Sequence, residues 1–136
     1  MKNLEVVGGI LVKEGKILCA KRGIGKYDYI SEKYEFPGGK IDPGENPKEA
    51  LHRELIEELE IHISIENMTP FYLVEHQYPD FFVRMHCFLC KMSDEPIVQR
   101  EHLDIQWRDL STIIDLEWVP ADLPVVEALI ERGIEG

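Results

Sequence analysis

The chain of 136 residues carries 15 Lys and Arg against 26 Asp and Glu, which gives a formal net charge of −11. This length favours a single domain, residues 1–136, that buries roughly two-thirds of the surface its unfolded form would expose. So acidic a chain repels a phosphate backbone, and polymeric nucleic acid is excluded as an expected partner. There is no signal peptide, and no apolar run approaches the roughly 18 residues of a membrane span. We therefore expect a cytoplasmic protein that does not contact the membrane.

The first third of the chain alternates strand and turn signals. Residues 4–12 and 16–21 are β-rich and are separated by Glu14-Gly15, which predicts a hairpin entering a sheet. Residues 23–33 lack an apolar period and carry Gly, Asp and Ser, which indicates a loop. A short strand over residues 34–36 is then expected to run into Pro37-Gly38-Gly39.

A helix is expected to begin at about Pro47. Asn46 is a favoured N-cap, proline fits the first helical position, and Glu49 completes a capping box. Along this helix, leucines at four-residue spacing form a buried stripe, while glutamates project from another face. The leucines are Leu51, Leu55 and Leu59.

The second half of the chain predicts strands over residues 71–75, 82–90 and 105–107, a short helix near 111–115 and a final helix over about 123–132. Strands and helices mixed in this order predict an α/β protein with a mixed sheet between helices. Cys87 and Cys90 lie on one expected strand, whose alternation points them to opposite faces. Core packing is therefore favoured over a redox or zinc pair.

The expected helix carries its main chemical signal in Glu54, Glu57 and Glu58. Positions i, i+3 and i+4 share one helix face, so these like charges repel unless cations lie between them. Carboxylate oxygens suit hard ions such as Mg²⁺ or Mn²⁺, and Mg²⁺ is usually held by a few carboxylates with phosphates and water. Arg53 lies four residues before Glu57, and its guanidinium can hold that carboxylate in position. The alternative is an ordinary solvated acidic face.

These residues stand in a longer phrase, Gly39-x5-Glu45-x7-Arg53-Glu54-Leu55-x-Glu57-Glu58-x-Glu60-Ile61. The phrase resembles the Nudix box at every specified position except Glu60, where the family has glycine. A glycine suits a left-handed helix end, so a non-glycine residue there costs on the order of 1 kcal/mol. We interpret this as a cost in stability that leaves the metal site intact.

The likeness extends to residues 34–40, to Glu101 six residues before Trp107, and to residues 120–124. Within the family, the chain resembles the MutT-like branch. In the Pro-Ala-Asp-x-Pro segment it resembles the (d)CTP pyrophosphohydrolases of that branch. This resemblance implies a Nudix-type α/β/α sandwich with a mixed parallel and antiparallel sheet. It also implies Mg²⁺-dependent hydrolysis of a nucleoside triphosphate to a monophosphate and pyrophosphate.

By the same resemblance, catalysis and metal binding fall on a defined set of residues. The expected metal ligands are the Gly38 carbonyl, Glu54, Glu57, Glu58 and Glu101. The expected catalytic residues are Arg53, Glu54, Glu57 and Glu101. Glu101 matches the loop position of the general base in MutT-like relatives, with Glu57 as the fallback; otherwise Glu101 is an ordinary charged loop residue. None of the histidines forms a ligand-like pair, so none is assigned to metal.

Substrate contacts are expected from five residues. Lys40 and Arg22 are the candidate phosphate cations, although Arg22 fits a plain surface role equally well. Phe36 and Tyr78 match positions that sandwich the base in relatives, and each is equally compatible with the core. Asp122 accepts hydrogen bonds when ionised, which suits the exocyclic amino group of cytosine, whereas the oxidised-guanine sanitiser has Asn there. Its alternative role is the N-cap of the last helix.

Two rival functions remain. One is clearance of 8-oxo-dGTP by the same chemistry, and the other is a catalytically silent Nudix module that binds a nucleotide. The expected partner in each case is a small nucleotide, and the protein is expected to be a monomer or a homodimer.

Overall fold

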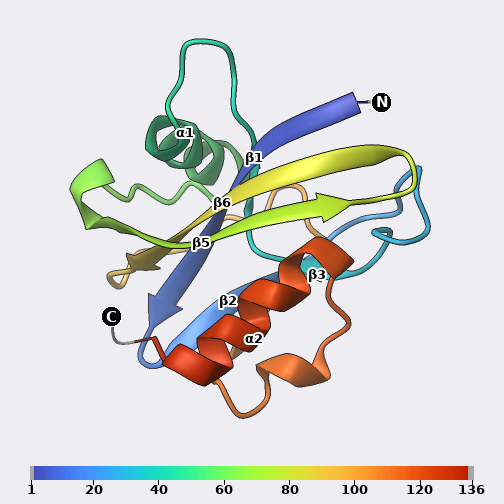
Figure 1. The fold of residues 1–136 in the computed structure, drawn as a ribbon. Coiled ribbons are helices and arrows are strands. Elements are labelled where there is room, and N and C mark those ends of the chain that lie inside the picture. The colour runs from blue at the N-terminus through green and yellow to red at the C-terminus, as the bar shows by residue number, and fades with distance from the viewer. Residues whose placement is uncertain (1, 135–136) are drawn as a thin grey trace.

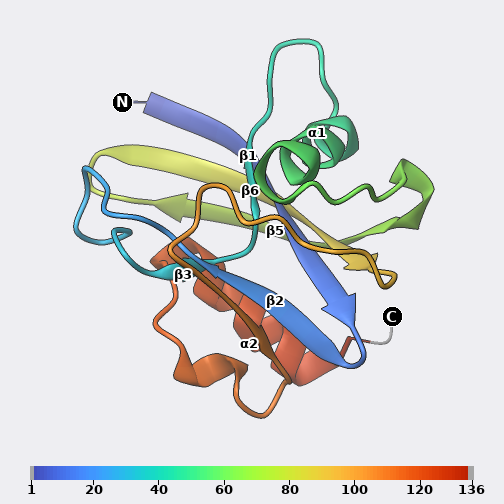
Figure 2. The same ribbon diagram turned by 180° about the vertical axis from the view of Figure 1, so that it is seen from behind.

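The computed structural model describes residues 2–134. Helix α1 (Pro47–Leu59) and helix α2 (Leu123–Arg132) lie on opposite sides of one β-sheet, as Figure 1 shows and Figure 2 confirms from behind. This arrangement confirms the predicted α/β class and the sandwich of a mixed sheet between helices. Within residues 2–134, no helix is long and apolar enough to cross a membrane.

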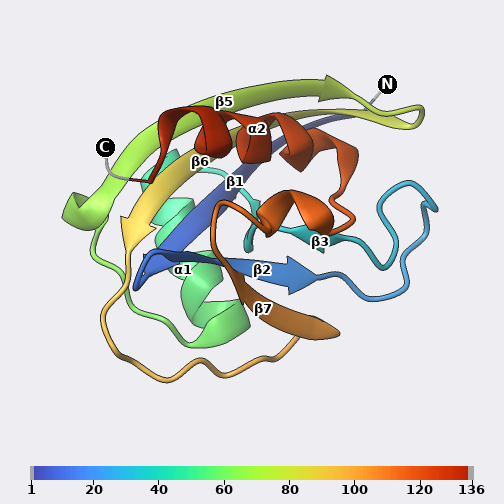
Figure 3. The same cartoon turned by 90° about the horizontal axis from the view of Figure 1, so that it is seen from below.

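The sheet has seven strands, in which β1 occupies the centre. Their bounds are β1 (Lys2–Lys13), β2 (Lys16–Lys21), β3 (Tyr34–Glu35), β4 (Gly38–Lys40), β5 (Met68–Gln77), β6 (Phe81–Lys91) and β7 (Asp104–Arg108). The main path runs β3-β2-β1-β6-β5, while β4 pairs with β1 and β7 pairs with β2. Strand β1 runs parallel to β6 and antiparallel to β2 and β4. Figure 3 shows β7 beside β2.

Most predicted elements are present, with bounds that differ at their ends. The hairpin turns at Glu14 and Gly15, which both take positive φ, 52° and 74°. The expected short helix near residues 111–115 is a single 3₁₀ turn, Ile113–Asp115, and two others occur at Ile65–Asn67 and Pro120–Asp122. Strand β4 was not predicted, because its Gly-Gly-Lys sequence has no strand signal; it forms because β1 offers it backbone partners.

Two apolar layers hold the sandwich together. The predicted leucine stripe of α1 is fully buried and packs on the face of the sheet that carries Leu11 and Phe88. Helix α2 covers the other face, where Val125 and Ile10 belong to a second cluster. The cysteines follow the predicted alternation, with Cys87 in the α2-side cluster and Cys90 in the α1-side cluster.

Candidate active site

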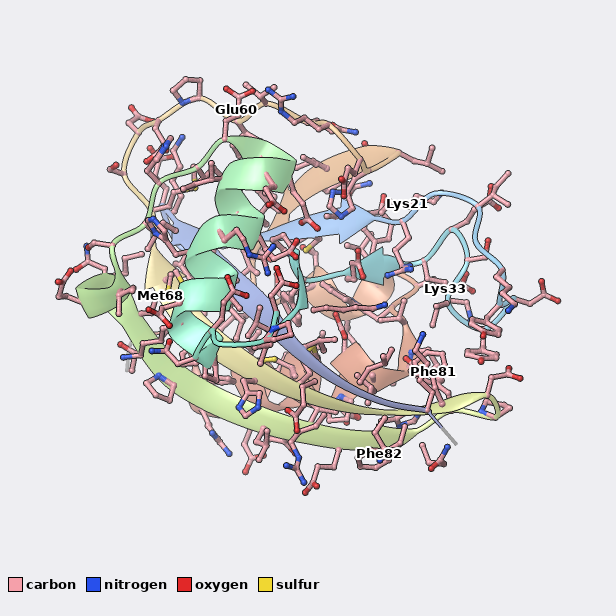
Figure 4. All side chains as sticks on the ribbon, turned by 90° about the horizontal axis from the view of Figure 1, so that it is seen from above. Lys21, Lys33, Glu60, Met68, Phe81 and Phe82 are labelled. Atoms are coloured by element: carbon pink, nitrogen blue, oxygen red, sulfur yellow. The ribbon has the colours of Figure 1, made fainter. Side chains whose placement is uncertain are left out.

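The start of α1 is fixed by its caps. Asn46 Oδ1 accepts the Glu49 N–H and Glu49 Oε1 accepts the Asn46 N–H, both at 2.9 Å, so the predicted capping box is confirmed. At the other end Glu60 is the left-handed C-cap, with φ 54° and ψ 37°. Its carboxylate pairs with Arg100, which belongs to the loop after β6. Glu60 is labelled in Figure 4, next to this loop. Both ends of α1 are therefore anchored, which limits rotation of the helix about its axis and so fixes the directions in which its glutamates point.

The three glutamates of α1 that are predicted to bind metal differ in exposure. The Glu57 side chain is 57% exposed and that of Glu54 is 15% exposed. Glu58 is buried, and its Oε2 accepts the Gly38 N–H at 3.3 Å. The sequence did not reveal this difference: Glu58 packs against β4, whereas Glu57 faces solvent.

The turn between β3 and α1 approaches the Glu54 carboxylate closely. A Cβ atom on Gly39 would lie 2.6 Å from the Glu54 carboxyl carbon, well inside van der Waals contact. At Gly38, φ is 156° and a Cβ would meet the carbonyl oxygen of Val7 at 2.0 Å. Gly38 is therefore required by close packing against β1, whereas a side chain at Gly39 would displace the Glu54 carboxylate.

Arg53 links the glycine turn to the carboxylates. It makes a bidentate contact with Glu45 at 2.7 and 2.9 Å. Its Nη1 donates to Glu54 at 3.0 Å and to Glu57 at 3.2 Å, which confirms the predicted pairing with Glu57. Its Nη2 also donates to the Lys40 carbonyl at 3.0 Å. The guanidinium therefore holds two of the glutamates in position, and it lowers the pKa of Glu45 to about 2.

The carboxylates are electrostatically crowded. Burial, followed by the charges of Glu35, Glu54 and Glu101, raises the pKa of Glu58 to about 9. The pKa of Glu54 is also raised, mainly by burial, with Glu101 again contributing and Arg53 opposing. The charge of Glu101 thus acts on both helix residues, so the fold brings this distant loop residue to the glutamates of α1, although no hydrogen bond joins it to them.

The ligand atoms of this site suit a hard divalent cation, because they are carboxylate oxygens. A cation among these glutamates would favour the charged forms that burial now opposes. Across residues 2–134, however, no three acidic, His or Cys side chains are already arranged to hold a metal ion. Arg53 engages Glu54 and Glu57, and the Gly38 amide engages Glu58. Binding a cation therefore requires these side chains to turn, and the predicted ligands stay a prediction.

A cavity of about 690 Å³ connects this acidic region with the predicted substrate residues. Its lining includes, from the predicted set, Arg22, Phe36, Gly38, Lys40, Glu58, Tyr78, Glu101 and Asp122. Arg53, Glu54 and Glu57 are not among its lining residues, and the Glu54 carboxylate lies against Gly39. One continuous space thus joins three of the metal-ligand candidates, Gly38, Glu58 and Glu101, to the base-binding candidates.

Asp122 closes the other part of the cavity. It is 3% exposed, and its Oδ2 accepts the Phe36 N–H at 2.9 Å. Asp122 stands at the N-cap position of α2, as the alternative predicted, but its side chain accepts no helix N–H, because the carboxylate is turned toward the Phe36 N–H. Burial, followed by the charge of Glu35, raises the pKa of Asp122 to about 8. Burial therefore favours the protonated carboxyl, which can donate as well as accept.

The two aromatic candidates serve the core and the cavity together. Phe36 packs against Trp118 with ring centroids 4.8 Å apart. Tyr78 stacks on Tyr29 at 4.9 Å, and its hydroxyl accepts the Ala121 N–H at 2.9 Å. Both rings are buried and both line the cavity, so the two interpretations are compatible. The stacking contacts fix the ring planes before any ligand arrives.

Two cavity residues were missed in the sequence. Glu35 Oε1 accepts from Arg22 Nη1 at 2.9 Å, so Arg22 is anchored in the cavity wall. Glu35 Oε2 accepts from His102 Nε2 at 3.2 Å, and the His102 side chain is 4% exposed. The available signal was position, because Glu35 precedes the Phe-Pro-Gly-Gly turn and His102 follows Glu101.

Comparison with known proteins shows which family has this sequence and architecture. The family model of the NUDIX domain matches residues 2–129. The chain is 32% identical over 132 residues to CTP pyrophosphohydrolase of Escherichia coli (strain K12), covering 96% of this chain and 93% of that one. It is 30% identical over 130 residues to 8-oxo-dGTP diphosphatase of the same strain, covering 95% and 98%. The solution structure of the E. coli ORF135 protein matches with a TM-score of 0.82 and 29% identity, covering 99% and 94%.

These matches define the class of the protein first: it is a hydrolase that acts on acid anhydrides. The chain belongs to the NUDIX family, with MutT-like proteins as its relatives. The predicted resemblance and fold are therefore confirmed. Nudix hydrolases generally use divalent metals, usually Mg²⁺, and act on small nucleotide substrates.

Proposed function

We propose that the protein hydrolyses a nucleoside triphosphate to the monophosphate and pyrophosphate with Mg²⁺, and that it prefers CTP, dCTP or a modified cytosine nucleotide. The observation that carries this proposal is the single cavity that joins Glu58, Glu101 and the glycine turn to buried Asp122. A nucleoside triphosphate requires both regions at once, because its phosphates need the acidic metal-binding region and its base needs the region around Asp122. Mn²⁺ is the expected substitute metal.

In this proposal Glu54, Glu57, Glu58, Glu101 and the Gly38 carbonyl hold the metal. When bound, such an ion lowers the pKa of water and balances charge on the attacking and leaving oxygens. Arg53 positions two members of this set. Its contacts with Glu45 and the Lys40 carbonyl hold the guanidinium in place, and the guanidinium in turn holds the Glu54 and Glu57 carboxylates. It is a positioning residue, because its guanidinium is paired with Glu45, Glu54 and Glu57.

Glu101 is the proposed general base. Its exposed side chain belongs to the cavity wall, and no hydrogen bond within residues 2–134 commits its carboxylate elsewhere. An uncommitted carboxylate beside the acidic helix is suited to take a proton from water. Glu57 is the alternative base, but its carboxylate is held by Arg53. Lys40 and Arg22 line the same space and supply positive charge for the phosphates.

The cytosine preference rests on Asp122. Its Oδ2 is used by the Phe36 N–H, which leaves Oδ1 for the edge of a base. An exocyclic amino group that donates to this oxygen would favour the ionised carboxylate and offset the burial that now opposes ionisation. The runner-up is 8-oxo-dGTP, which gains support because a protonated Asp122 both donates and accepts, as an amide does.

Rates for a panel of nucleotides at equal concentration, with pyrophosphate detection, separate these substrates. We expect the kcat/KM for dCTP to exceed that for 8-oxo-dGTP. The reverse ratio would replace the cytosine assignment with guanine-nucleotide sanitation. Tight nucleotide binding by calorimetry with no pyrophosphate released in Mg²⁺ would instead support a silent binding module.

A further inference from the structure

His102 is a buried polar residue of the cavity wall to which the proposed chemistry gives no role. Its Nε2 lies 3.2 Å from Glu35 Oε2, and only 4% of its side chain is exposed. Its Nδ1 is the one buried side-chain nitrogen or oxygen within residues 2–134 that has no hydrogen-bond partner. A carboxylate accepts, so Nε2 carries the proton and donates, and Glu35 is the hydrogen-bond partner that orients the ring.

Glu35 is itself immobilised. Its second oxygen accepts from Arg22 Nη1 at 2.9 Å, and strand β3 pairs with β2 at Ala20 and Glu35. The Glu35 side chain is 20% exposed and lines the same cavity. His102 is therefore attached to a part of the sheet that is rigid and that faces the substrate space.

The backbone of the loop is attached on both sides of Glu101. Before it, the Arg100 N–H donates to the Glu58 carbonyl at 3.3 Å. After it, the Leu103 N–H donates to the Lys21 carbonyl at 2.8 Å, and the His102 side chain contacts Glu35. Of these three attachments, the His102 contact is the one made by a side chain, and it lies next to Glu101 in the chain. It therefore bears most directly on how the segment between Arg100 and Leu103 presents Glu101 to the glutamates of α1.

We propose that His102 is a positioning residue for Glu101, acting through its hydrogen bond to Glu35. The inference rests on the proposed function, in which Glu101 takes the proton from the attacking water. The Glu101 carboxylate makes no hydrogen bond to residues 2–134 that would set its direction, so its placement comes from its neighbours in the chain. Loss of the His102 contact lets the loop shift, and small displacements of a catalytic group are costly in rate.

The test is a double-mutant cycle with His102→Phe and Glu101→Gln. Phenylalanine keeps a buried ring and removes both nitrogens, including the unpaired one, so folding is expected to survive. In the wild-type background we expect kcat to fall by about 10- to 100-fold with little change in KM. In the Glu101→Gln background the same change is expected to cost less than about threefold, because the group it positions is already absent.

Two further variants separate positioning from packing. His102→Gln keeps an amide N–H that can reach Glu35, and we expect it to restore kcat to within about threefold of wild type. His86→Phe removes a comparable pair, His86 Nε2 to Glu5 Oε2 at 3.1 Å, outside the cavity lining, and kcat is expected to stay unchanged. If His102→Phe does not fold, as judged by its melting temperature, His102→Asn replaces it, since its amide is too short to reach Glu35.

The outcomes distinguish this inference from the proposed function. An active His102→Phe beside a slow Glu101→Gln overturns the inference and leaves the proposed base in place. Equal losses in both backgrounds, or no recovery with glutamine, also overturn it, because they indicate a role independent of Glu101. Full activity of Glu101→Gln removes the base from Glu101 and the positioning role of His102 with it.

Discussion

Asp122→Asn tests the electrostatic reasoning about the buried end of the cavity. Burial and Glu35 raise the pKa of Asp122 from 3.8 to about 8, against the opposing effects of the Phe36 N–H and Arg22. Between these pH values the folded protein binds more protons than the unfolded chain, so its stability falls as pH rises. Asparagine keeps an acceptor for the Phe36 N–H and does not titrate. Its stability advantage over wild type should therefore grow across this window.

The size of the effect follows from the shift in pKa. Each tenfold change in proton affinity is worth about 1.4 kcal/mol, which sets an upper limit on the order of 5 kcal/mol at alkaline pH. Part of the effect is already expressed below pH 5, and relaxation and water entry reduce such costs, so we expect the difference in free energy of unfolding to grow by about 2 to 4 kcal/mol from pH 5 to pH 9. The shifted pKa of Glu58 is common to both proteins and cancels.

The assay is urea unfolding of both proteins at a series of pH values, without metal or nucleotide. Asp115→Asn, at an exposed position, controls for the general loss of a carboxylate. A difference that stays flat within about 0.5 kcal/mol would refute the reasoning, because ionisation of Asp122 would then cost nothing. The same unfolding series tests whether the Asp122 side chain acts only as a helix cap. Asparagine caps as well as aspartate, so a capping role alone predicts no pH trend in the difference.

Three further substitutions probe α1 and its glycine turn. Glu57→Gln should leave the melting temperature unchanged, because this side chain is exposed, yet lower kcat by about 100-fold, or roughly 3 kcal/mol of barrier; a loss below tenfold in saturating Mg²⁺ would contradict the metal assignment. Gly39→Ala should displace the Glu54 carboxyl, lowering activity far more than stability; equal Mg²⁺ dependence in variant and wild type would argue against it. Glu60→Gly should raise stability by roughly 0.5 to 1 kcal/mol at full activity, because relief of the left-handed cap outweighs an exposed pair with Arg100; a lower melting temperature would reverse that balance.

Local signals made much of the fold predictable. The hairpin at Glu14-Gly15 and the start of α1 at Asn46 depend on residues within a few positions of one another, and both are present. The leucine stripe of α1 followed from helical periodicity for the same reason. Strand β4 was not predictable in this way, because its partner is β1 and its own residues carry no strand preference.

The site was less accessible to sequence reasoning, since its contacts span the chain. The Asp122 carboxyl accepts from the Phe36 N–H, a partner 86 residues away, whereas the sequence suggested only a ligand or the adjacent helix as its partner. Glu58 turns beneath Gly38 because β4 lies there, which helical periodicity alone does not reveal. His102 showed no pairing with another histidine, and its partner Glu35 is 67 residues away.

The most direct test of the account identifies the products of a single nucleotide. Purified protein with Mg²⁺ and dCTP, analysed by anion-exchange chromatography, should yield dCMP and pyrophosphate in equal amounts, and removal of the metal by a chelator should stop the reaction. Release of orthophosphate with dCDP, or turnover that persists without any divalent ion, would contradict the proposed reaction.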